Sequence, residues 1–372
     1  MQYRDFGKTG LKVSALGFGA MRLPSIMNVI LEDEAIAVIQ RAFDLGVNFL
    51  DTGFVYGESE LVCGKALKKY PRDKIMVCSK NPMWDKNYTD THWRKKLELS
   101  LKRMQLSYFD LYAVWHDVRM DAYLESKKAE NNWLKEALKA KKEGVLKHLI
   151  ISCHDTPENM IKLFEEGYLE GMIMQYNLLD RVNEKVIEYA HKNGYGIAIM
   201  GPVAGGKLGP PSPEIQGLIP GGSKSTAELA LRFVLSNPGV STAMSGMNTV
   251  KMAEENCAVA SSEKPLSAEE LKGIQAALDE KKKLADLYCT DCKYCMPCPN
   301  RVNIPANFSA MNSFRLYGLK EHAKHVYQHL TERKASAEFC KECKKCEEKC
   351  PQKIKIAEQL KEVVAALKET QL

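Results

Sequence analysis

Residues 75–116 read IMVCSKNPMWDKNYTDTHWRKKLELSLKRMQLSYFDLYAVWH. Two short apolar runs, residues 75–79 and 109–114, flank an amphipathic stretch at 90–104. Apolar runs of this length are typical of strands buried on both faces, and the charged stretch has the period of a helix. The segment therefore predicts a strand, a helix and a second strand in sequence.

The same alternation extends through residues 1–285. Apolar runs predict eight strands, at residues 14–18, 48–51, 75–79, 109–114, 148–152, 172–175, 196–200 and 241–244. Amphipathic stretches predict helices at 31–45, 59–69, 90–104, 157–166, 182–192, 226–235 and 249–260, and residues 123–143 read as one long solvated helix. Eight strands separated by helices within about 250 residues predict the α/β class and a (β/α)8 TIM barrel.

An open doubly wound sheet is the rival fold. It would need a phosphate-binding GxGxxG motif after an early strand. The nearest candidate, Gly17-Phe18-Gly19, lacks the third glycine and opens no amphipathic helix. The barrel is therefore the preferred interpretation.

Eight of the twelve cysteines form two runs near the carboxyl terminus, CTDCKYCMPCP at 289–299 and CKECKKCEEKCP at 340–351. In two-cluster ferredoxins three closely spaced thiolates hold one cubane, and the fourth, followed by proline, ligates the other. We therefore expect two 4Fe-4S clusters with crossed ligands. One would use Cys289, Cys292, Cys295 and Cys350, and the other Cys340, Cys343, Cys346 and Cys298.

Disulfides and zinc are the alternatives for these cysteines. No apolar signal segment opens the chain, so it reads as an intracellular, cytoplasmic protein whose thiols stay reduced. Zinc takes four ligands from two knuckles, whereas each run here carries a third and a fourth cysteine. Residues 286–372 are accordingly expected to form a small helical, ferredoxin-like dicluster domain, with helices within 304–338 and a closing helix at 354–367.

Charge and hydropathy exclude two classes of partner. The net charge is +6 and no apolar stretch is long enough to span a membrane. Six lysines lie among the second cysteine run without the interleaved aromatic residues that nucleic-acid binding would favour. They are expected to offset cluster charge or to dock an acidic redox partner, such as a ferredoxin.

Catalytic groups of a barrel project from the carboxyl ends of its strands. Asp51 and Lys80 close the second and third predicted strands, Tyr56 follows the second and His116 follows the fourth. A lysine ammonium lowers the pKa of a tyrosine, and an aspartate anchors the lysine, so these four residues predict a proton-transfer site. A single buried Asp-Lys pair, taken alone, is more often structural.

These residues resemble the aldo-keto reductase family. The resemblance covers residues 1–285 and rests on RDFGKTGLKVSALGFGAMRLP at 4–24, DTGFVYGESE at 51–60, SK at 79–80, QYN at 175–177 and SGMNTVKMAEEN at 245–256. With the cysteine runs, the chain resembles the subgroup that carries a carboxyl-terminal dicluster ferredoxin domain. The family is a barrel that reduces carbonyls with a bound nicotinamide.

The resemblance implies a role for each matching residue. Tyr56 would be the general acid, supported by Asp51 and Lys80, and a histidine would orient the carbonyl oxygen. Ser152 and Gln175 would hold the nicotinamide carboxamide, and the stretch from Gly246 to Asn256 would bind the adenosine end.

The histidine is one departure from the family pattern. DLYAVWH places Trp115 where the family has histidine and His116 one residue later, and one step along a strand points a side chain to the other face. His116 can serve if a bulge or a strand ending redirects it. His154, after the next predicted strand, is the alternative.

The residues expected to bind the cofactor also depart from the family pattern. Met200 aligns with the aromatic residue that stacks on nicotinamide, and Gly246 and Met252 align with the basic residues that hold the 2′-phosphate of NADP. The choice between NADP(H) and NAD(H) is therefore open. Lys207, after Gly205 and Gly206, is a candidate cofactor contact, since barrel enzymes often bind phosphate after the seventh strand, and residues 209–225 read as an active-site loop.

The cofactors expected in the two predicted halves differ in the number of electrons that they transfer at a time. A nicotinamide transfers two electrons as a hydride, whereas a cubane passes one, so a flavin is a candidate intermediary. The leading hypothesis is an oxidoreductase that reduces a carbonyl or an activated alkene of a small-molecule substrate, using nicotinamide, the clusters or both. The alternatives are an electron-transfer adaptor for a separate partner, and a reductase whose clusters are structural or sensory.

Overall fold

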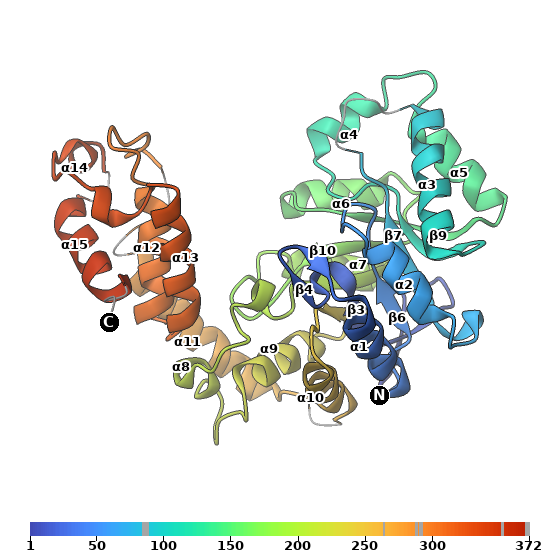
Figure 1. Ribbon diagram of the computed structural model, residues 1–372, viewed down its shortest axis with the longest axis horizontal. Coiled ribbons are helices and arrows are strands. Elements are labelled where there is room, and N and C mark those ends of the chain that lie inside the picture. Colours follow the sequence, from blue (N-terminus) through green and yellow to red (C-terminus); the bar gives the residue numbers. More distant parts are fainter. Residues whose placement is uncertain (84–88, 263–264, 287–288, 290–292, 351–352, 369–372) are drawn as a thin grey trace. The chain divides into compact units, whose positions relative to one another are not determined.

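The structure is a computed structural model that describes residues 1–83, 89–262, 265–286, 289, 293–350 and 353–368. The chain folds into two compact units, one of residues 1–205 with 230–265 and one of residues 206–229 with 266–372 (Figure 1). No helix in the described ranges is long and apolar enough to cross a membrane. The functional division at residue 285 stays a prediction.

Eight parallel strands close into a barrel in the order β10-β11-β12-β3-β6-β7-β8-β9. Every residue of β8 is buried, as expected for a parallel strand that is covered on both faces. The predicted (β/α)8 barrel is therefore confirmed. The strands are β3 (Leu16–Gly19), β6 (Phe49–Asp51), β7 (Met76–Lys80), β8 (Phe109–Ala113), β9 (Leu146–Ser152), β10 (Gly171–Gln175), β11 (Gly196–Met200) and β12 (Thr242–Ser245).

Helices follow the barrel strands, and local side chains define their ends. The Thr156 hydroxyl accepts a hydrogen bond from the backbone N–H of Asn159, and Pro157 occupies the first turn, so α6 begins there. Gln105 adopts a left-handed conformation and ends α3. The α-helices are α1 (Glu32–Asp44), α2 (Ser59–Leu67), α3 (Asp90–Met104), α4 (Met120–Ser126), α5 (Trp133–Lys142), α6 (Pro157–Glu165), α7 (Glu184–Asn193), α9 (Thr226–Leu235) and α10 (Val250–Ser261), with short 3-10 turns η1 (Ala20–Arg22), η2 (Arg72–Lys74) and η3 (Ala204–Gly206).

The single solvated helix predicted at residues 123–143 is wrong. Two helices, α4 and α5, occupy this region, because the Asn132 side chain accepts from the backbone N–H of Leu134 and starts a new helix. Trp133 is fully buried on α5 and packs edge to face against Trp115. The apolar residues were outnumbered by lysines and glutamates in the sequence, but they form one buried stripe.

An antiparallel hairpin of β1 (Tyr3–Asp5) and β2 (Lys12–Ser14) fills the amino end of the barrel. Phe6, in its turn, is fully buried and belongs to the barrel's apolar core. Its ring lies against the first residues of β10 and β11, where a Cβ on Gly196 would come within 2.1 Å of a ring carbon. The opposite, carboxyl end therefore remains for a site. A second hairpin, β4 (Ser25–Ile26) with β5 (Val29–Ile30), follows η1; neither hairpin was predicted.

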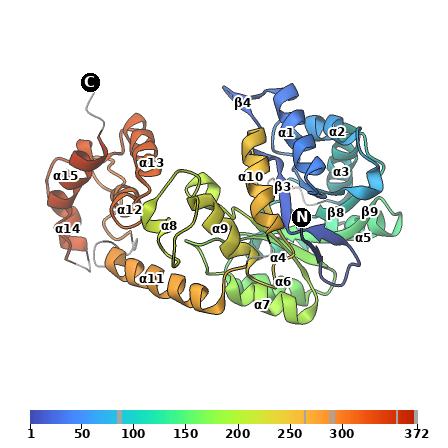
Figure 2. The ribbon, with the colours of Figure 1, turned by 90° about the horizontal axis from the view of Figure 1, so that it is seen from below.

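The second unit is helical around its own apolar core. Helices α12 and α13 lie side by side with α15 against them (Figure 2). The expected helices within 304–338 and near 354–367 are thus present. Ser212 donates a hydrogen bond to the carbonyl oxygen of Tyr317 at 2.7 Å, which ties the 206–229 segment to this unit. The helices are α8 (Pro213–Gln216), α11 (Ala268–Asp286), α12 (Ile304–Arg315), α13 (Lys320–Glu332), η4 (Ala337–Phe339), α14 (Lys345–Lys349) and α15 (Ile356–Leu367).

Candidate active site

Strand register brings the predicted site residues to one end of the barrel. Asp51, the last residue of β6, is paired with Gly19 on one side and Cys78 on the other. Lys80, the last residue of β7, is paired with Ala113 at the end of β8. Because the strands are parallel, all of these residues lie at the carboxyl rim, where barrel enzymes carry their chemistry.

Asp51 and Lys80 form a buried ion pair at this rim. Lys80 Nζ lies 2.6 Å from each carboxylate oxygen of Asp51 and 2.7 Å from the carbonyl oxygen of Thr52. The two side chains are 7% and 2% exposed, respectively. Burial opposes the charge on Lys80, but the neighbouring Asp51 carboxylate outweighs it and raises the pKa of Lys80. Lys80 is therefore an ammonium at neutral pH.

Tyr56 lies in the loop after β6, half-buried, beside this ion pair. Lys80 Nζ lies over the Tyr56 ring, 4.9 Å from its centre, so its charge acts on the phenol. Burial raises the pKa of Tyr56, and the Lys80 ammonium acts in the opposite direction without cancelling it. The expected lowering by lysine is thus present as a contribution, but burial decides the net direction. The phenol stays protonated at neutral pH, as a proton donor requires.

His116 reaches the same place because β8 ends early. The strand stops at Ala113, and residues 114–117 bend, with the His116 N–H bonded to the carbonyl oxygen of Asn81 at 2.9 Å. The His116 and Tyr56 rings are 5.6 Å apart, edge to face. A strand ending therefore supplies the redirection that the sequence requires. Burial, followed by the charges of Lys80 and His154, lowers the pKa of His116 to about 4, so the ring is neutral at neutral pH.

Three of the predicted nicotinamide contacts end successive strands. Ser152 closes β9 and is buried, while Gln175 and Met200, which close β10 and β11, are half-buried and paired in register. Gln175 Nε2 donates to Asp180 Oδ2 at 2.7 Å. With its amino group held in this way, Gln175 keeps its side-chain carbonyl oxygen as a hydrogen-bond acceptor.

The predicted adenosine site follows β12. Asn256 Nδ2 donates to Ser245 Oγ at 3.2 Å, which joins α10 to the end of β12, and Gly246 is exposed next to it. Lys251, the basic residue nearest this site in the sequence, pairs with Glu255 at 3.7 Å on the exposed face of α10. Lys251, paired in this way, adds little positive charge to the region, and nucleotide binding here stays a prediction.

Lys207 belongs to the second compact unit and is half-buried there. Burial, followed by the charges of Lys207 and His325, lowers the pKa of His322 to about 4. Lys207 therefore lies near the His322 side chain of the same unit. Its contact with a cofactor stays a prediction.

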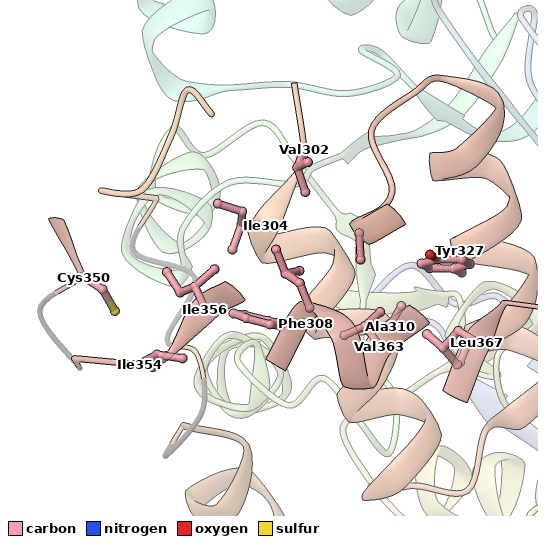
Figure 3. Packing of buried hydrophobic residues seen from close by; sticks show 13 residues of the cluster. Val302, Ile304, Phe308, Ala310, Tyr327, Cys350, Ile354, Ile356, Val363 and Leu367 are labelled. Carbon is pink, nitrogen blue, oxygen red and sulfur yellow. The ribbon is translucent and has the colours of Figure 1, made fainter. Parts of the chain in front are cut away.

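The predicted cluster ligands border the apolar core of the second unit. Figure 3 shows this core, with Cys350 among its residues. Cys350 is buried in that core, and Cys289, Cys295, Cys298, Cys340 and Cys346 pack against it. Cys343 is exposed, and Cys292 lies outside the described residues. No group of three His, Cys, Asp or Glu residues in the described part of the chain could hold a single metal ion.

The thiols fit the donor set of a cubane. Burial, followed by the charges of Glu347, Cys298 and Cys340, raises the pKa of Cys346 to about 11. A thiol of the first run is therefore close to two of the second, as crossed ligation requires. The backbone N–H of Glu342 also bonds Cys340 Sγ at 3.4 Å, a contact of the kind that tunes cluster thiolates.

Two partners of the site were missed from the sequence. Cys78, which is paired with Asp51 across β6 and β7, is buried beside the Asp51 carboxylate, and its thiol acts to lower the pKa of Asp51. Asp180 orients Gln175. Pairing of the second and third predicted strands could have suggested Cys78, whereas the Asp180 contact depends on a loop fold that no local pattern reveals.

Comparison with known proteins finds a family model for each of the two parts of the chain. A family model described as the aldo/keto reductase family matches residues 15–279, and one described as a 4Fe-4S dicluster domain matches residues 288–355. The chain is 30% identical over 313 residues to L-galactose dehydrogenase of Arabidopsis thaliana, which covers 76% of this chain and 96% of that protein.

Two further comparisons cover a similar share. An uncharacterized oxidoreductase of Bacillus subtilis is 25% identical over 309 residues, covering 74% of this chain and 96% of its own. The structure of an aldo-keto reductase from Bacillus halodurans, in its holo form, superposes with a TM-score of 0.64 at 28% identity, covering 74% of this chain and 96% of that one. These relatives align with the barrel and support an oxidoreductase.

Proposed function

This chain belongs to the aldo/keto reductase family, and we propose that it reduces the carbonyl group of a small molecule with Tyr56 as the proton donor. The observation that carries the proposal is the contact of a protonated, half-buried Tyr56 with the Lys80 ammonium at the carboxyl rim of the barrel. A general acid must hold its proton at the working pH and deliver it to a developing oxyanion.

The neighbouring residues divide the remaining work. The Asp51–Lys80 pair fixes the ammonium that stabilises charge on the Tyr56 oxygen once the proton leaves. Neutral His116, with its ring 5.6 Å from that of Tyr56, can donate a ring N–H to the substrate oxygen. We assign this role to His116 rather than His154, because His116 is half-buried beside Tyr56 whereas His154 is exposed.

The strand ends after Ser152, Gln175 and Met200 suit a nicotinamide dinucleotide, which supplies a hydride when bound. Gln175, with its amino group held by Asp180, would accept from the carboxamide N–H, and Ser152 would donate to the carboxamide oxygen. Gly246 and Asn256 would line the adenosine end. NADP(H) and NAD(H) fit these residues equally well.

The cysteine-bearing unit would supply single electrons. Cubanes held by the two cysteine runs do not accept a hydride directly, so a flavin in the barrel is a candidate intermediary between them and the substrate. Five exposed lysines that make no ion pair with described residues surround the second run and suit an acidic redox partner such as a ferredoxin. These are Lys341, Lys344, Lys345, Lys349 and Lys353.

Turnover of a panel of aldehydes and ketones by the anaerobically prepared holoprotein tests the proposal, with NADPH and NADH as donors. Tyr56→Phe should lower kcat by about 10²- to 10⁴-fold and leave the affinity for the dinucleotide unchanged. Tyr70→Phe is the matched control: its hydroxyl bonds Asp44 away from the rim, at 2.6 Å, and its loss should not affect kcat. Full activity of Tyr56→Phe would remove the assigned role.

The electron route needs its own measurement. Absorbance spectra of the same preparation, with iron, sulfide and flavin contents, should show clusters that are reduced on adding NADPH if the two halves exchange electrons. A protein that binds flavin under reconstitution and then reduces its clusters supports the intermediary. Clusters that respond to an external ferredoxin but not to NADPH would favour the electron-transfer adaptor instead.

A further inference from the structure

The loop that carries Tyr56 is held by a side chain from a helix later in the chain. Arg103, in the last turn of α3, donates from Nη1 to the carbonyl oxygen of Phe54 at 3.1 Å and from Nη2 to that of Gly57. Its guanidinium also lies over the Phe54 ring, 5.2 Å from the centre. One arginine therefore bonds the backbone on both sides of Tyr56.

The same guanidinium faces a fully buried carboxylate. Arg103 Nη1 lies 3.1 Å from Glu60 Oε2, and the two side chains are 19% and 0% exposed, respectively. The other oxygen, Glu60 Oε1, accepts from Ser79 Oγ at 2.7 Å. Ser79 directly precedes Lys80 in β7, so Glu60 connects Arg103 to the strand end that carries the ammonium. Because separating a buried ion pair is costly, the guanidinium has a fixed place relative to β7.

The backbone bonds of the loop itself are longer or local. The N–H of Phe54 meets the carbonyl oxygen of Lys80 at 3.5 Å, which is beyond the usual range, and the N–H of Tyr56 bonds to Gly53 within the loop at 3.0 Å. The Tyr56 ring lies against Gly53, where a Cβ would be 3.2 Å from two ring carbons. Arg103 thus gives this loop shorter, charge-assisted bonds to the body of the barrel.

We propose that Arg103 is a positioning residue for proton donation, because it fixes the loop that holds the Tyr56 hydroxyl beside Lys80. This inference rests on the proposed role of Tyr56. A general acid has to lie within hydrogen-bond reach of the atom that it protonates, and a displacement of about 1 Å can cost about 100-fold in rate. Arg103 acts through the backbone of the loop, so its loss should slow turnover without weakening the binding of the dinucleotide.

Steady-state kinetics and amide hydrogen exchange of the anaerobic holoprotein test the proposal. Arg103→Lys keeps a cation beside Glu60 but lacks the fork that bonds two carbonyl oxygens. It should lower kcat about 10- to 100-fold, leave the substrate KM and the Kd of the dinucleotide unchanged, and speed the exchange of amides 53–57. Arg103→Gln with Glu60→Gln, which removes both buried charges, should lower kcat at least as much.

An arginine on the same helix provides the control. Arg94 of α3 forms ion pairs with Glu98, Glu136 and Glu143, at 2.9, 3.0 and 2.6 Å. Arg94→Lys disturbs these pairs without touching residues 53–57, so it should leave kcat and the exchange of this loop unchanged.

Each other outcome has a distinct meaning. Wild-type kcat in both Arg103 variants, or exchange of amides 53–57 that neither variant changes, would overturn the inference. A fall in kcat that Arg94→Lys reproduces would also overturn it, since disturbance of α3 would then be sufficient. Full activity of Tyr56→Phe would refute the proposed function together with this inference, whereas a loss in Tyr56→Phe that Arg103→Lys does not share would refute this inference alone.

Discussion

The barrel rim and the cysteine-bearing unit hold their reactive groups in opposite ways. At the rim, Asp51 and Lys80 project from strand ends, are nearly buried and neutralise each other through contacts of 2.6 Å. In the second unit most of the described cluster thiols lie in short segments between helices, and Cys346 lies in the short helix α14. Cys343 is exposed, between Glu342 and Lys344, which both have a positive φ.

The two sites therefore differ in what holds their reactive groups in place. Opposite charges inside the protein stabilise one another, so the rim is assembled by the fold alone. Neighbouring thiolates repel one another, and the raised pKa of Cys346 reflects burial together with that repulsion. The cysteine-bearing unit should therefore depend on its inorganic clusters for order, while the rim should depend on the barrel.

Loss of one ligand should have the largest effect. Cys298→Ala should remove about half of the iron and half of the cluster absorbance, because a cubane takes four thiolates and this one would keep three. The barrel should still unfold as in the wild type. Iron analysis and visible spectra of anaerobic protein measure this, with Cys257→Ala, a buried cysteine of α10, as the control that keeps all its iron. Unchanged iron in Cys298→Ala would refute crossed ligation.

Breaking the Asp51–Lys80 ion pair should have the second-largest effect. Lys80→Met leaves the buried Asp51 carboxylate without its counter-charge and should cost about 3–5 kcal/mol in the free energy of unfolding. Lys80→Met with Asp51→Leu should recover most of that stability without recovering turnover. Urea unfolding of the barrel measures both.

An exposed pair provides the control for this prediction. Lys12 and Asp5 lie 2.9 Å apart with side chains 70% and 68% exposed, so Lys12→Met should change the free energy of unfolding by about 1 kcal/mol at most. If Lys80→Met were no more destabilising than Lys12→Met, the rim would not be held by its ion pair.

The smallest effect should come from the titration of His116. Its pKa is lowered to about 4 in the folded protein by burial, Lys80 and His154, from an ordinary value of 6.5. Between these two values the unfolded chain binds more protons, so wild-type stability should fall as the pH drops from 6.5 toward 4. His116→Gln should lose about 1–2 kcal/mol less over that window. Tm against pH measures the difference. Parallel curves for His116→Gln and wild type would show that His116 already titrates in the folded protein as it does in the unfolded chain.

Much of the barrel and of its rim could be predicted because both depend on local patterns. Apolar runs located the strands, and the last residue of a strand in a parallel barrel is necessarily at the rim, so Asp51 and Lys80 could be placed together. The helix at 123–143 was misjudged because a cap at Asn132 and a buried Trp133 outweigh a majority of charged residues.

Local patterns in the amino-acid sequence give the period of the strands and helices, the cysteine spacing and the residues at each strand end, since these are properties of neighbours along the chain. Three features depend on the folded chain: the ending of β8 turns His116 toward Tyr56, burial keeps Tyr56 protonated, and residues 206–229 pack with the second unit. Burial and long-range contact are set by segments far apart in the chain, and a local pattern carries no information about them.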